Sequence, residues 1–211
     1  MQPVKARERV SPGKPISGWA RWGGRALVLT GGLWMITYLA GVLDGRLIDP
    51  DFFDGSALMW IGMIASEVAQ LCLGTGLIVL GTRLWTHAKR LAAAGMALET
   101  IALVTLLIDL ILFPSLLKGA LLPRELSAAT TVALFAGMAL LGIASVRTRA
   151  LPGIAALVLL LVGVLTVPLI FLAFPLGSVA PNYLVSDLPL VLAAVLLILV
   201  GIGVQRRWRE A

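Results

Sequence analysis

Three acidic residues stand inside long apolar stretches of this 211-residue sequence and are its strongest candidates for chemistry: Glu67, Glu99 and Asp109. An ionised carboxylate is costly to bury, so each of these side chains is expected to be uncharged and to face a protein interior or a wet cavity. Carboxyl groups in such places can carry protons, form hydrogen bonds or bind a hard cation. The three acids therefore form the centre of a candidate polar site.

Other polar and aromatic residues extend this site. The candidate polar site comprises Glu67, Gln70, Glu99, Thr105 and Asp109, and the candidate cavity lining comprises Trp34, Tyr38 and Pro168. Pro168 has no N–H for the carbonyl of Val164, which is then available to line a cavity. Trp34 lies in the middle of an apolar stretch, where filling of space between helices is favoured over stacking on a ligand.

The residue counts exclude several classes of active site. The chain has one cysteine, Cys72, and one histidine, His87, so a disulfide within the chain and a His-rich metal centre are both excluded. No GxxxxGK[ST] or GxGxxG pattern indicates nucleotide binding. We predict no catalytic residues, no cofactor and no metal site from the sequence.

The composition predicts the elements that must position the acids. Hydrophobic residues make up 59% of the chain and charged residues 13%, whereas a soluble domain is roughly half apolar and one quarter charged. Helices are the expected spanning elements, because lone spans must satisfy their backbone internally in lipid. The sequence predicts an all-α, polytopic bundle with six transmembrane helices near 26–43, 57–82, 91–117, 125–146, 151–174 and 188–205.

The basic residues predict an orientation. Fourteen of the 17 fall on one side of this layout: Lys5, Arg7, Arg9, Lys14, Arg21, Arg25, Arg83, Lys89, Arg90, Arg147, Arg149, Arg206, Arg207 and Arg209. Lysine and arginine accumulate on the cytoplasmic side, so we expect both termini in the cytoplasm and the chain in the cell (inner) membrane. Trp19, Trp22, Trp85 and Trp208 are expected at the same interface. The net charge of +6 is attributed to this orientation and not to nucleic-acid binding.

The chain is accordingly divided into three parts. Residues 1–25 are predicted to be a basic, disordered cytoplasmic arm, 26–205 the transmembrane domain and 206–211 a short basic cytoplasmic tail. The connections are too short for a soluble domain, so any function is expected inside the bundle or on its faces. The acidic stretch Asp49–Gly55 departs from the EF-hand pattern and is interpreted as a solvated turn. Asp187 is interpreted as a helix cap.

Helix geometry suggests how two of the acids meet. Glu67 and Glu99 are each about 12–14 Å from opposite ends of their predicted helices, close to the bilayer midplane. Both lie on faces with small residues that favour close helix approach, and we hypothesise that these faces meet and bring the two carboxyls together. In the fourth segment, Ala129, Ala133 and Gly137 recur at four-residue spacing, which predicts a helix contact within the chain or between copies.

Three functions fit these observations. A non-catalytic accessory, assembly or sensory bundle is favoured, because no catalytic constellation is recognisable. The alternative is a small proton-linked or solute transporter that uses the intramembrane carboxylates. An intramembrane enzyme is the third and least supported interpretation. The expected partners are the lipid bilayer and either further copies of the chain or a larger membrane complex, without nucleic acid.

Overall fold

The fold is known from a computed structural model, which describes residues 18–43, 57–116, 124–176 and 188–210. Its helices are α1 (Gly18–Leu43), α2 (Ala57–Leu84), α3 (Lys89–Leu116), α4 (Arg124–Thr148), α5 (Gly153–Leu176) and α7 (Leu188–Glu210). Each contains an apolar stretch that is long enough to cross a membrane. The predicted six-helix membrane bundle is confirmed for the described residues, and the chain is a multi-pass membrane protein.

Two helices extend by more than one helical turn beyond the apolar segments predicted from the sequence. The first begins at Gly18 rather than near residue 26, and α7 continues to Glu210 rather than ending near residue 205. These added turns contain the charged and tryptophan residues that border the apolar stretch. A helix keeps its backbone hydrogen bonds outside hydrocarbon, while arginine and tryptophan remain at the interface. The end of the apolar stretch is therefore not the end of the helix.

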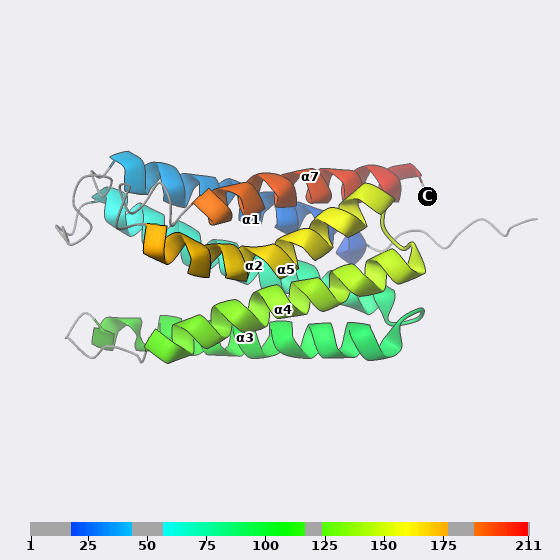
Figure 1. Ribbon diagram of the computed structural model, residues 1–211, viewed down its shortest axis with the longest axis horizontal. Coiled ribbons are helices and arrows are strands. Elements are labelled where there is room, and N and C mark those ends of the chain that lie inside the picture. Colours follow the sequence, from blue (N-terminus) through cyan, green and yellow to red (C-terminus); the bar gives the residue numbers. More distant parts are fainter. Residues whose placement is uncertain (1–17, 44–56, 117–123, 177–187, 211) are drawn as a thin grey trace, which may run out of the picture.

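The six helices form a closed ring. Contacts join α1 to α2, α2 to α3, α3 to α4, α4 to α5, α5 to α7 and α7 back to α1, and α2 also touches α4 across the ring. In Figure 1, α1 and α7 form one side of the molecule, α3 and α4 form the opposite side, and α2 and α5 lie between them. The ring buries one face of every helix and leaves the others for lipid.

Short turns fix the direction of neighbouring helices. Residues 85–88 connect α2 to α3, and the N–H of Ala88 donates to the carbonyl of Leu84 at 2.8 Å. Residues 149–152 connect α4 to α5, where Arg149 adopts a positive φ of 54°, the left-handed conformation that ends many helices. Connections this short place consecutive helices antiparallel and side by side.

Small residues and threonine hydroxyls hold the helices together. Water does not drive helices together inside a bilayer, so close packing and hydrogen bonds must do so. The hydroxyl of Thr30 on α1 lies 3.2 Å from the carbonyl oxygen of Ala69 on α2, and that of Thr37 lies 3.1 Å from the carbonyl oxygen of Gly62. Glycines such as Gly24 and Gly201 let α1 and α7 approach closely.

The interior and the outer surface of the bundle are both apolar. The interior contains large, fully buried side chains, among them Leu27, Leu73, Leu77, Phe135, Met138, Leu141, Leu159 and Leu197. The outer surface exposes isoleucine, leucine and phenylalanine, for example Ile111 on α3 and Ile154 and Phe171 on α5. An apolar outer surface of this kind is matched to lipid tails and not to water.

Candidate functional site

Of the acidic side chains that the structure describes, Glu99 is the most deeply buried. It lies on α3 with 0% of its surface exposed. Neither carboxyl oxygen has a hydrogen-bond partner among the described residues. Buried polar groups are normally hydrogen-bonded, so a carboxyl group without a partner in this environment is costly to bury. The residue is therefore the centre of the candidate site.

A glycine on α4 creates the space for this carboxyl group. A Cβ at Gly137 would lie 2.5 Å from Oε1 of Glu99 and 3.0 Å from the carbonyl oxygen of Gly95. Any side chain at position 137 would thus collide with the acid and with the backbone of α3. The small-residue stripe of the fourth segment predicted a helix contact, and Gly137 confirms such a contact within the chain.

The hypothesis that Glu67 and Glu99 meet is wrong. On α2, a Cβ at Gly74 or Gly81 would contact the side chains of Leu103 and Met96 respectively. These pairs set the register of the two antiparallel helices and place Glu99 level with Ile78. Because Ile78 follows Glu67 by eleven positions, the two acids are roughly 16 Å apart along the helix axis.

Two features of the helices explain this correction. Both α2 and α3 have 28 residues, more than the roughly 20 that cross a bilayer. Glu67 and Glu99 each lie about ten residues after the start of their helix, and the two starts are at opposite ends of the antiparallel pair. In helices of this length, the two positions therefore do not meet at the centre. In addition, the face of α3 that carries Gly95 and Glu99 turns toward Gly137 of α4 and not toward α2.

The remaining predicted site residues are distributed over several helices. Gln70 on α2 and Tyr38 on α1 are partly buried, as is Glu67, which has an interaction partner. The hydroxyl of Thr105 donates to the carbonyl of Ile101 in its own helix at 2.8 Å. Pro168 is exposed on α5. The side chain of Asp109 lies outside the described residues, as do residues 49–55 and Asp187.

The side chain of Trp34 lies in the interior of the six-helix bundle. Its ring stacks on that of Phe135 of α4, with 6.2 Å between the centroids and 28° between the planes. Trp34 is 7% exposed and Phe135 is 1% exposed, so both rings are enclosed by the bundle. Offset aromatic pairs at this separation stabilise a packed interior. This stacked aromatic pair fills the space between α1 and α4.

The sequence did not predict Phe135 as the partner of Trp34 or Gly137 as the partner of Glu99. Phe135 lies between Ala133 and Gly137, in the stripe that was noted only for its small residues. A large aromatic residue beside small ones is a signal of close packing, but it does not identify the helix that it meets. No group of three His, Cys, Asp or Glu side chains suited to a metal ion occurs in the part of the chain that the structure describes.

Comparison with known proteins adds no relative. The sequence matches no known protein family, and neither the curated proteins nor the solved structures give a significant match. The chemistry of the site must therefore be argued from the residues themselves. A single enclosed carboxyl group can hold one proton or accept and donate hydrogen bonds.

Proposed function

We propose that this protein is a non-catalytic membrane bundle that serves as an accessory, assembly or sensory component of a larger membrane complex. The observation that supports this most directly is the filled interior, in which Trp34 stacks on Phe135 between α1 and α4. A bundle with close-packed aromatic and aliphatic side chains at its centre is a stable framework for contacts with other membrane proteins.

The orientation of the bundle is part of the same proposal. The N-terminal end of α1 and the C-terminal ends of α2, α4 and α7 carry exposed basic residues, such as Arg25, Arg83, Arg147 and Arg206. Under the positive-inside rule this end faces the cytoplasm of a cell membrane, with both termini on that side. Residues 18–25 of the predicted basic arm belong to α1, and residues 206–210 of the predicted basic tail belong to α7. In this orientation the basic residues of these two helix ends are within reach of a cytoplasmic partner.

The experiment is a measurement of the native assembly. A tagged chain is extracted in two mild detergents, and the mass of its complex is compared with the 22.3 kDa of one chain. We expect a larger assembly with the same protein composition and stoichiometry in both detergents. A chain that purifies alone in both detergents, or with components that differ between them, would contradict the accessory role.

A second candidate function is a small proton-linked carrier, and one observation favours it. Glu99 is fully buried and neither of its carboxyl oxygens has a hydrogen-bond partner among the described residues. Intramembrane acids are commonly retained for proton or substrate movement, because their burial lowers stability.

Proton flux into purified proteoliposomes distinguishes the two candidates. Under an imposed membrane potential, a carrier would acidify the vesicles faster than empty liposomes, and Glu99→Gln would abolish the difference. Thr75→Val is the control, because the Thr75 hydroxyl is exposed and bonds within its own helix at 2.7 Å. Equal flux in empty, wild-type and Glu99→Gln vesicles would eliminate the carrier.

A further inference from the structure

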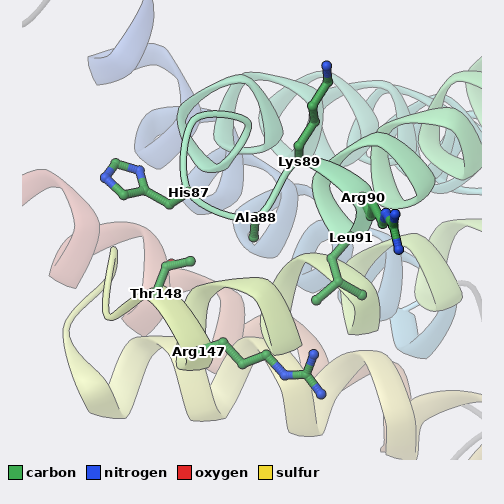
Figure 2. Close-up of a pocket in the computed structure, with 7 residues that line it drawn as sticks. All are labelled: His87, Ala88, Lys89, Arg90, Leu91, Arg147 and Thr148. Atoms are coloured by element: carbon green, nitrogen blue, oxygen red, sulfur yellow. The ribbon is translucent and has the colours of Figure 1, made fainter.

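The basic end of the bundle contains a depression between two helices. It lies where the turn before α3 approaches the end of α4, and it has a volume of about 410 Å³. Its polar lining consists of His87, Lys89, Arg90, Arg147 and Thr148, and these five residues define the basic depression. Figure 2 shows Arg90 and Arg147 extending from α3 and α4, with Leu91 between them.

The ionisable residues that line the basic depression are all basic, and none of them is acidic. The side chains of His87, Lys89, Arg90 and Arg147 are all exposed. Among the side chains that the structure describes, the acidic ones are Glu67 and Glu99, which lie within the apolar stretches of α2 and α3. Two guanidinium groups from different helices can bind one anion through paired N–H donors, and phosphate fits this geometry well.

The backbone adds to the attraction for an anion. The N–H of Ala92 donates to the carbonyl of Ala88 at 2.9 Å, so Lys89, Arg90 and Leu91 form the open first turn of α3. The N–H groups of a first turn point away from the helix, and the helix dipole places a partial positive charge there. Phosphate groups bind readily at such an end.

The tryptophans locate the basic depression at the level of lipid headgroups. Trp85, in the turn directly after α2, is 41% exposed, and Trp22 on α1 at the same end of the bundle is 57% exposed. The Lys89 ammonium lies over the Trp85 ring, 5.8 Å from its centroid. Exposed indoles on membrane proteins sit at the headgroup level. Phosphate is the abundant anion at that depth.

We propose that the basic depression is a binding site for a phosphate group. The group is presented by an anionic phospholipid of the adjacent leaflet or by free phosphate in solution, and the two sources share the same contacts with Arg90 and Arg147. This site is separate from Glu99 and does not depend on the proposed accessory function. Membrane orientation alone requires basic residues anywhere at this end, whereas phosphate binding requires these two arginines.

The test compares variants that lose equal charge. Arg90→Gln with Arg147→Gln removes two charges from the basic depression. Arg25→Gln with Arg206→Gln removes two exposed charges at the same end of the bundle, outside the depression. Binding of phosphatidylglycerol is measured by native mass spectrometry from mixed micelles, with phosphatidylcholine as the neutral reference. Binding of inorganic phosphate is measured by calorimetry in detergent.

We expect wild type to retain phosphatidylglycerol or to bind inorganic phosphate saturably. The depression variant should bind the same probe about tenfold more weakly, because a charge-assisted hydrogen bond to each arginine is lost. The charge-matched control should stay within about twofold of wild type, as expected for screened surface charges. The probe that binds identifies the source of the phosphate group.

A second variant keeps the test decisive if the glutamine pair does not elute as a single folded species. Arg90→Lys with Arg147→Lys keeps the net charge but removes the planar guanidinium forks, and it should also bind more weakly than wild type. Equal loss of binding in the depression variant and the charge-matched control would overturn the proposal. So would the absence of saturable binding of both probes by wild type.

Discussion

At the scale of single residues, the carboxyl group of Glu99 fits between α3 and α4 because residue 137 is a glycine and has no side chain. Its Oε1 lies where a Cβ at position 137 would come within 2.5 Å, so the acid and the glycine form one unit across α3 and α4. The sequence identified the acid by its place in an apolar stretch. It could not identify the partner, because small residues occur on several helices and none of them specifies which acid it accommodates.

Gly137→Ala is expected to lower the free energy of unfolding by about 1–3 kcal/mol, the usual cost of overpacking. The penalty exceeds the helix-propensity gain of alanine over glycine, which is at most about 1 kcal/mol. In a Glu99→Ala background the carboxyl group is gone and the same change should cost less. Unfolding in mixed SDS micelles gives the four free energies of this double-mutant cycle. Strict additivity would contradict direct contact between Glu99 and residue 137.

At the scale of the helices, the existence of the elements followed from the sequence, but their mutual rotation did not. Apolar runs of sufficient length gave six helices, and α2 was placed within two residues of its observed bounds, Ala57–Leu84. An amphipathic helix reveals which face points inward, whereas helices that are apolar all round do not. This is why the face with Glu99 was assigned to α2 when it contacts α4.

The seam between α1 and α7 gives a prediction with a control on the same helix. A Cβ at Gly201 would lie 2.6 Å from the carbonyl oxygen of Gly24, whereas one at Gly203 would make only an ordinary contact of 3.8 Å with Ala155. Gly201→Ala should therefore lower the melting temperature in detergent. Gly203→Ala should leave it unchanged or raise it, since alanine favours helix. Similar shifts for both variants would show that the two helices are not in close contact at Gly201.

At the scale of the whole molecule, the closed ring places the ends of α2, α4 and α7 together with the start of α1. The charge census predicts that this end faces the cytoplasm. This orientation could be predicted from the sequence because basic residues are counted along the chain, without knowledge of packing. The ring itself could not be derived in this way, since contacts such as α7 with α1 join helices at opposite ends of the sequence.

Labelling of single cysteines checks the orientation. In a Cys72→Ser background, Thr86→Cys lies in the turn between α2 and α3, and Asp51→Cys lies in the connection predicted for the outer side. A membrane-impermeant maleimide added to intact cells should label position 51 directly and position 86 only after permeabilisation. The reverse pattern would invert the topology and move the basic depression to the outer leaflet.

The packed bundle requires an interior that is filled by side chains and not by water. A variant that retains Trp34 but carries phenylalanine in place of Trp19, Trp22, Trp60, Trp85 and Trp208 reports on that interior. We expect its emission at short wavelength and little quenching by acrylamide, because Trp34 is 7% exposed and stacked on Phe135. A variant that retains only Trp22, 57% exposed, supplies the reference. Quenching of Trp34 as strong as that of Trp22 would mean a water-filled interior and would contradict the packed bundle.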